Sequence, residues 1–185
     1  EIINDDILNF NYDAYLNKKI IIFGNLPYNI STQILTSWIK INNLNNFCKK
    51  FVLMFQKEVA DRILAKHNSK EYGRLSIISS WKLDIKKILD VDPSSFYPPP
   101  KIKSSLLLFT PKLNYYKLKN PKNLENVTNI FFNQRRKMIK KPLKILFKDF
   151  NKIAEELSLD LNLRPQNLKN ITYYKICDLY EKLLK

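Results

Sequence analysis

Short apolar runs and amphipathic stretches alternate along the chain. Residues 20–23 and 51–55 hold β-branched, aromatic and other apolar side chains without a polar break, which is typical of strands buried on both faces. Residues 83–91 and 104–110 predict two further strands. The first part of the chain therefore favours a sheet-containing domain.

The segment after the first strand predicts a helix that Ser31 or Thr32 can cap. Its apolar positions at helical spacing are Ile34, Leu35, Trp38 and Ile39. Residues 56–64 and 75–81 predict two more helices. Strands that alternate with helices indicate an α/β fold, in which ligands bind at the carboxyl ends of the strands.

Pro111 marks the expected domain boundary, because strand signals give way to helical spacing after it. We expect an α/β domain in residues 1–112 and a small helical domain in residues 113–185. The apolar positions of the second part are Leu124, Val127, Ile130, Phe131, Ile139, Leu143, Leu146, Phe147, Ile176, Leu179, Tyr180 and Leu183.

The charge balance is strongly basic, with 32 Lys and Arg against 17 Asp and Glu and a net charge of +15. Such an excess favours a polyanionic partner, with nucleic acid first among the candidates. Charge alone does not distinguish RNA, DNA and an anionic membrane surface as partners, and a solvated basic face without a partner is also possible. A hydrophobic content of 45% excludes general disorder.

The remaining composition limits other kinds of site. Cys48 and Cys177 lie far apart and form no CxxC pair, so we expect free thiols in a reducing cytoplasm. His67 is the one histidine, too few for a histidine-based metal site. We therefore expect no metal. No apolar run reaches transmembrane length, so we also expect no membrane partner.

The residues Asn25, Leu26, Pro27 and Tyr28 directly follow the first strand. The Asn25 side-chain oxygen and a nearby backbone carbonyl can accept both hydrogens of an adenine amine, which aims its nitrogen for attack. Pro27 restricts Leu26 and so holds the carbonyl direction. Tyr28 offers a flat face to a base taken out of its stack. A proline turn with a core tyrosine is the alternative interpretation.

Five ordered motifs extend this pattern over essentially the whole chain. They are residues 25–32 (NLPYNIST), 56–62 (QKEVADR), 72–76 (YGRLS), 96–101 (FYPPPK) and 133–137 (NQRRK). The chain thereby resembles the ribosomal RNA adenine N6,N6-dimethyltransferases, specifically the bacterial kasugamycin-resistance type that acts on small-subunit RNA.

The resemblance implies a Rossmann-like sheet that binds S-adenosylmethionine, followed by the small helical domain. It implies dimethylation of the N6 amines of two adjacent adenines in a small-subunit rRNA hairpin, without a metal and as part of ribosome biogenesis. Nothing in the sequence demands more than a monomer, and we expect one in the cytoplasm. The implied catalytic residues are Asn25, Leu26, Pro27, Tyr28 and Phe96. The implied cofactor contacts are Asp6 and Asn25, and the implied RNA contacts are Lys101, Arg135, Arg136 and Lys137.

Two of these assignments have structural alternatives. Asp6 matches the acidic residue that accepts a hydrogen bond from the cofactor's adenine amine, but an Asp can also cap a turn. Phe96 is implied to pack on the target adenine together with Tyr28, but it can also be a core residue under a proline loop. We expect residues 1–4 to end a strand before Asp6.

The glycine content sets the sequence apart from the family pattern. The chain has only Gly24 and Gly73, whereas members of the family bind S-adenosylmethionine with a Gly-rich loop after the first strand. We therefore expect that this chain lacks the N-terminal part of the methyltransferase domain and is incomplete as a sheet. A natural variant that has lost the loop is the alternative.

Two rival functions stay open. A non-catalytic factor that binds immature small subunits would need the basic residues but not the amine chemistry of Asn25. A DNA adenine methyltransferase would share that chemistry, but Leu26 stands where those enzymes have the first of two prolines, which favours the rRNA family.

Overall fold

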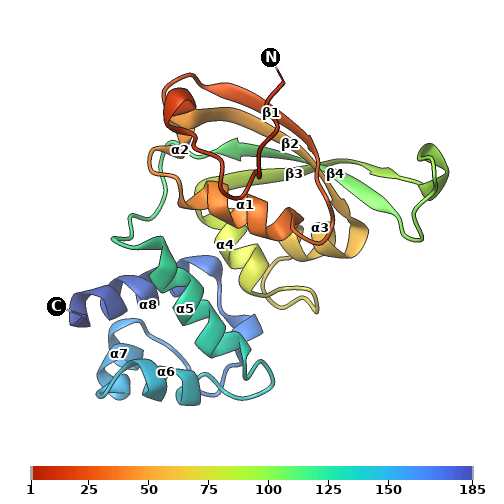
Figure 1. Ribbon diagram of the computed structural model, residues 1–185. Helices are drawn as coiled ribbons and strands as arrows, with labels where there is room; N and C mark the ends of the chain where they lie inside the picture. The colour runs from red at the N-terminus through yellow and green to blue at the C-terminus, as the bar shows by residue number, and fades with distance from the viewer. Residues whose placement is uncertain (1, 185) are drawn as a thin grey trace. The chain divides into compact units, whose positions relative to one another are not determined.

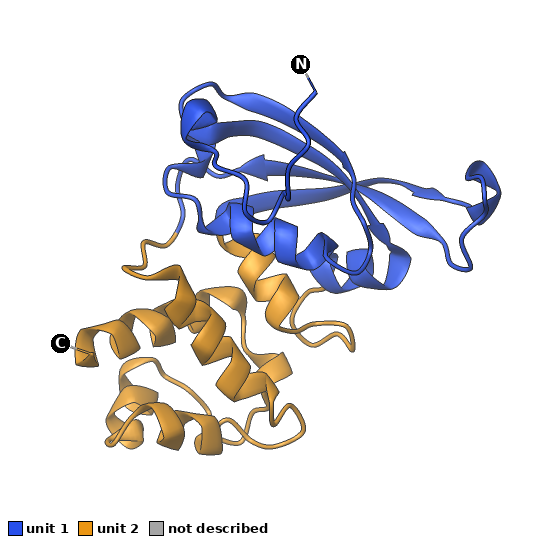
Figure 2. Cartoon of the chain, viewed as in Figure 1, with its two compact units in different colours: residues 1–64, 82–115 blue, residues 65–81, 116–185 orange. Residues whose placement is uncertain are grey.

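The computed structural model describes residues 2–184 and divides into two compact units (Figure 2). The first unit comprises residues 1–64 and 82–115, and the second comprises residues 65–81 and 116–185. Residues 65–81 thus group with the C-terminal helices. The functional division at residue 112 stays a prediction.

The first unit is built on a four-stranded mixed sheet with the order β1-β2-β4-β3 (Figure 1). β1 (Ile20–Asn25) runs parallel to β2 (Cys48–Gln56). β4 (Ser104–Pro111) is antiparallel to both β2 and β3 (Leu83–Val91). The carboxyl end of β1 and the first residue of β4 therefore meet at the same edge of the sheet.

The predicted α/β fold and the four strands predicted within residues 20–110 are confirmed, with one correction to burial. β1 was expected to be buried on both faces, yet Ile21 is 49% exposed and Phe23 is 76% exposed. Ile20 and Ile22 instead share an apolar pocket with Trp38, so only one face of β1 is covered in the described part of the chain. A continuous apolar run cannot show which neighbours lie beside an edge strand.

Helix α1 (Ser31–Lys40) confirms the predicted helix, and its buried side includes the four predicted apolar residues. Trp38 stacks on Phe51 of β2 with ring centroids 5.3 Å apart. The predicted cap is wrong: Ile30 is the N-cap residue, and Ser31 is already helical and donates its hydroxyl to the Tyr28 carbonyl at 3.1 Å. The other helices of this unit are η1 (Asp13–Tyr15), α2 (Leu44–Phe47), α3 (Lys57–Leu64) and η2 (Pro93–Ser95).

The N-terminal segment does not form the expected strand, since residues 2–4 have no regular structure. A turn follows, in which the Asp6 carboxylate accepts the Leu8 amide at 3.0 Å and the Asn9 side-chain amide at 2.9 Å. Glu1, the first residue of that prediction, lies outside the described residues. The alternative role of Asp6 as a turn-capping residue is therefore present in the structure.

The second unit is helical, as predicted. Its elements are α4 (Arg74–Lys82), α5 (Pro121–Phe132), α6 (Lys140–Leu146), α7 (Phe150–Glu156), η3 (Pro165–Asn167) and α8 (Asn170–Leu183). α5 and α8 pack against each other, and the Phe131 and Tyr173 rings meet edge to face at 5.3 Å. Leu183, an expected core residue of α8, is 62% exposed, while Tyr173 and Cys177 are fully buried.

A buried carboxylate anchors the start of α5. Glu181 on α8 is only 4% exposed and accepts the backbone amides of Lys119 at 2.7 Å and Asn120 at 2.9 Å. It also accepts the Asn123 side-chain amide at 3.1 Å. One acidic side chain thus satisfies the backbone amides of the two residues that lead into α5 and the Asn123 side chain in its first turn.

Replacing Glu181 with Ala should lower the free energy of unfolding by about 2 to 3 kcal/mol, because it leaves buried amides without an acceptor. Urea unfolding followed by circular dichroism measures this change. Glu155→Ala, at an exposed position of α7, should change stability by less than about 0.5 kcal/mol. Equal losses in the two variants would contradict the anchoring role.

Candidate active site

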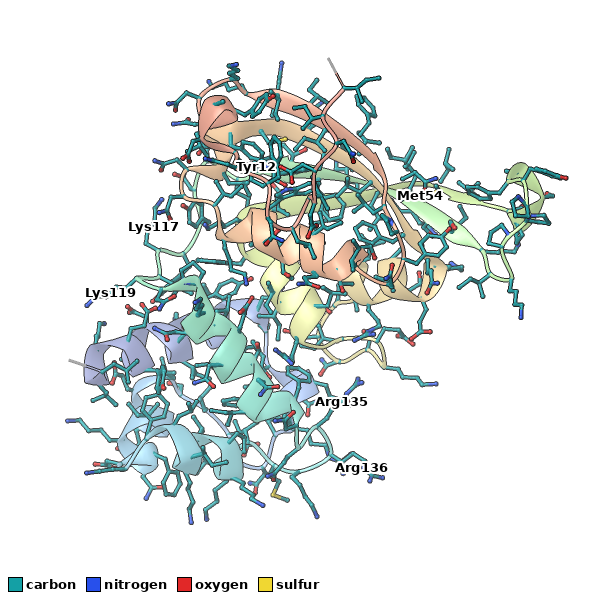
Figure 3. The ribbon with its side chains drawn as sticks, viewed as in Figure 1. Tyr12, Met54, Lys117, Lys119, Arg135 and Arg136 are labelled. Carbon is teal, nitrogen blue, oxygen red and sulfur yellow. The ribbon has the colours of Figure 1, made fainter. Side chains whose placement is uncertain are left out.

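The Asn-Leu-Pro-Tyr motif lies between β1 and α1 within the first unit. Asn25 is the last residue of β1 and is exposed; its register partner on β2 is Met54, which Figure 3 labels. The Pro27 carbonyl accepts the Ile30 amide at 3.2 Å, and the Tyr28 carbonyl accepts the Ser31 hydroxyl. These bonds fix the turn that leads from the motif into the helix.

Gly24 permits a close approach that shapes this turn. A Cβ atom at this position would lie 2.9 Å from Cδ2 of Leu26 and 2.9 Å from Cδ2 of Leu53. Leu26 therefore folds back over the glycine, against a fully buried residue of β2. A Cβ atom there would have to push aside the ends of the Leu26 and Leu53 side chains.

A hydrogen bond fixes the Tyr28 ring. Its hydroxyl lies 2.6 Å from Oγ of Ser104, which is fully buried at the start of β4. The next residue, Ser105, donates instead to Asp90 at 2.6 Å, since neighbouring residues of a strand face opposite sides. That hydrogen bond, with help from Lys87, lowers the pKa of Asp90 to about 2. Of these two serines, only Ser104 can thus form a hydrogen bond with the motif.

The proline-rich segment between η2 and β4 is anchored at its base. Lys103 Nζ lies 2.7 Å from Asp92 Oδ1, and the Lys103 carbonyl accepts the Lys57 amide at 2.9 Å. Pro98, Pro99 and Pro100 restrict the backbone between these contacts and Phe96. The segment can therefore hold aromatic rings in place.

These two segments form one open cleft with a volume of about 370 Å³. It is lined by Asn25, Leu26, Pro27, Tyr28, Phe96, Tyr97, Pro98 and Pro100. The structure thus brings together all five predicted catalytic residues, from positions about 70 residues apart. Sequence reasoning missed two features: Tyr97, which the proline motif contains, and Ser104, for which no sequence signal exists.

Asp6 does not line this cleft, and its position next to the cofactor stays a prediction. The turn that carries it is tied to α1 through Tyr12, which Figure 3 labels. The Tyr12 hydroxyl donates to the Ile7 carbonyl at 3.0 Å and accepts the Trp38 indole N–H at 2.8 Å. Burial raises the pKa of Tyr12. The Asp6 carboxylate itself is exposed and retains acceptor sites, so it fits a ligand amine.

The predicted RNA contacts differ in exposure. Lys101, Arg136 and Lys137 are exposed, and Arg136 extends away from the helices (Figure 3). Arg135 is half-buried: Nε donates to the Gln166 side chain at 3.2 Å, and the guanidinium also donates to the carbonyls of Ser69 and Lys70. Arg135 therefore fastens a loop within the second unit.

Other candidate chemistry is limited. Burial raises the pKa of Cys48 to about 11 and that of Cys177 to about 12, which keeps both thiols protonated and unreactive. Within residues 2–184, no cluster of His, Cys, Asp and Glu could hold a metal ion. No helix in the same range is long and apolar enough to cross a membrane.

Comparison with known proteins identifies the family. The model of the ribosomal RNA adenine dimethylase family matches residues 1–185. The chain belongs to this family. A ribosomal RNA small subunit methyltransferase A of Pelagibacter ubique is 58% identical over 183 residues, covering 99% of this chain and 70% of that protein. The protein of the same name from Cereibacter sphaeroides is 40% identical, over 91% of this chain and 60% of that protein. The dimethylase chain thus spans 60 to 70% of the length of these relatives.

Solved structures agree with this assignment. A dimethyladenosine transferase from Plasmodium falciparum superposes with a TM-score of 0.77 and 27% identity, covering 88% of this chain and 67% of that one. A 23S rRNA methyltransferase, ErmE, superposes over 100% of this chain and 72% of its own, with a TM-score of 0.63 and 16% identity. The second comparison shows the shared methyltransferase fold alone.

Ser104→Ala should reduce the free energy of unfolding by about 1 kcal/mol and release the Tyr28 ring from its fixed position, because the Tyr28 hydroxyl loses its hydrogen-bond partner. Chemical denaturation measures the first effect, and the NMR line widths of the Tyr28 ring measure the second. Ser105→Ala is the matched control, since it removes an equally buried hydroxyl that faces Asp90. Similar changes of the Tyr28 signals in both variants would contradict the assigned role.

Proposed function

We propose that this dimethylase-family chain takes part in S-adenosylmethionine-dependent dimethylation of the N6 amines of two adjacent adenines in a small-subunit rRNA hairpin. The observation that supports it most is the single cleft that contains Asn25, Leu26, Pro27, Tyr28 and Phe96. The names of the most similar relatives favour the same RNA. Such a substrate belongs to ribosome biogenesis in the cytoplasm, and we expect a monomer.

The motif at the end of β1 supplies the amine chemistry. The Asn25 side-chain oxygen accepts one hydrogen of the adenine amine, and the Leu26 carbonyl accepts the other. Both bonds draw the nitrogen lone pair out of conjugation and aim it along one direction, which stabilises the transition state more than the ground state. The cationic product amine is acidic, so water can take its proton.

Two aromatic side chains hold the target base. The Tyr28 ring is fixed through Ser104, and the Phe96 ring stands on the proline-rich segment across the cleft. A base placed between aromatic faces has left its stack in the RNA, which suits an enzyme that modifies an amine at the base edge. Neither ring needs to move a proton.

The methyl donor would contact the chain through Asp6 and Asn25. S-adenosylmethionine, when bound, supplies an electrophilic methyl group on a sulfonium. The exposed carboxylate of Asp6 can accept its adenine amine while it still caps the turn at Leu8. Tyr12 holds that turn against α1.

Basic residues of the two segments would bind the rRNA backbone. Lys101 stands on the proline-rich segment, and Arg136 and Lys137 stand between α5 and α6. Exposed cations of this kind bind phosphates with a strong dependence on salt. Arg135 would contribute indirectly, because its guanidinium already donates to Gln166 and to the Ser69 carbonyl and so holds the neighbouring loop in place.

Asn25→Ala should lower the rate of methyl transfer by about 100- to 1,000-fold, because one acceptor of the amine is lost. Transfer from labelled S-adenosylmethionine to unmodified small ribosomal subunits measures this rate. Asn42→Ala, at an exposed position after α1, should leave the rate unchanged. An Asn25→Ala protein that keeps full activity would refute the proposal. Subunit binding without any transfer by the unsubstituted protein would make this chain the docking and target-base part, and transfer that also fails once a Gly-rich cofactor segment is supplied would favour the assembly-factor alternative.

Replacing both Arg136 and Lys137 with Ala should weaken binding to small subunits and reduce the slope of log affinity against log salt by about 1.5. Filter binding at several salt concentrations measures this slope. Arg135→Ala should act differently, with lower stability of the second unit and little change in the slope. The reverse pattern would show that Arg135 is the phosphate contact.

A further inference from the structure

The aromatic side chain of Tyr97 has no role in the fold or in holding the target base. Its side chain is 100% exposed, although it lines the same cleft as Tyr28 and Phe96. Most exposed apolar side chains of the first unit lie elsewhere, as Phe23 does on β1. In the proposed function, this exposed ring can contact RNA beside the target base.

The position of this ring is set by a stiff backbone. Pro98, Pro99 and Pro100 follow it directly, and the Lys103–Asp92 ion pair closes the base of the segment. In Figure 1 the connection between β3 and β4 projects beyond the sheet at the tip of the hairpin. Binding therefore orders only the two side-chain torsions of Tyr97, which is a small entropic penalty for a large flat contact.

We propose that Tyr97 stacks on the unpaired nucleotide next to the target adenine. The inference rests on the proposed function, in which Tyr28 and Phe96 already hold one base. RNA that presents one unstacked base at this cleft also presents its neighbours, and aromatic rings recognise such bases through their faces. Stacking tolerates any base, so Tyr97 would fix the register of the strand rather than its sequence.

Tyr97→Ala should raise KM for the RNA about 5- to 100-fold while KM for S-adenosylmethionine stays unchanged. Tyr97→Phe keeps the ring and should remain within about 2-fold of the unsubstituted protein. Phe23→Ala removes an exposed aromatic ring outside the cleft and serves as the matched control, with no expected change in KM for RNA. Because Tyr97 is fully exposed, its replacement should not disturb folding.

A direct reading of the contact uses single-stranded RNA with one target adenine and the fluorescent base 2-aminopurine on either side of it. One of the two probes should be quenched by the unsubstituted protein and by Tyr97→Phe, but not by Tyr97→Ala. Equal quenching by all three proteins, or an unchanged KM in Tyr97→Ala, would overturn the inference. Quenching needs no methyl transfer, so it decides whether Tyr97 stacks even where the proposed function fails.

Discussion

The hydrogen bond between the Tyr28 hydroxyl and Ser104 is the contact on which the cleft depends. It joins residues 76 positions apart, and it exists only because β1 and β4 both flank β2 and present opposite chain ends at one edge. Parallel pairing of β1 with β2 and antiparallel pairing of β2 with β4 place the motif beside the proline-rich segment. The mixed sheet thus assembles a site that neither segment contains alone.

The rigidity of the cleft comes from different sources on its two sides. On the β1 side, the absence of a side chain at Gly24 lets Leu26 pack toward the buried Leu53, which ties the motif to the core of the sheet while Asn25 and Pro27 stay exposed. On the other side, prolines and one ion pair restrain a segment that is otherwise exposed. In the proposed function, packing against the core would suit the residues that align the amine, and an exposed stiff loop would suit aromatic rings that meet RNA.

Hydrophobic periodicity predicted the positions of strands and helices well, but it predicted poorly which of their side chains are buried. The four strands and α1 follow from local side-chain patterns, which depend on near neighbours in the chain. The free face of β1, the buried Tyr173 and the buried Glu181 depend on partners that are distant in sequence, so no local pattern indicates them. The motif residues of the cleft could be predicted because their chemistry is specific, whereas Ser104 is an ordinary strand serine until Tyr28 lies beside it.

Arg135 and Arg136 show why a motif cannot assign roles to identical neighbours. Both carry the same charge in the same NQRRK segment, and the sequence predicts phosphate binding for both. The backbone after α5 turns Arg135 toward the carbonyls of Ser69 and Lys70 and leaves Arg136 in solvent. A guanidinium that satisfies backbone carbonyls strengthens a loop, and the loop in turn fixes where its exposed neighbour can meet a phosphate. In the proposed function, the first arginine would therefore support RNA binding by geometry rather than by charge.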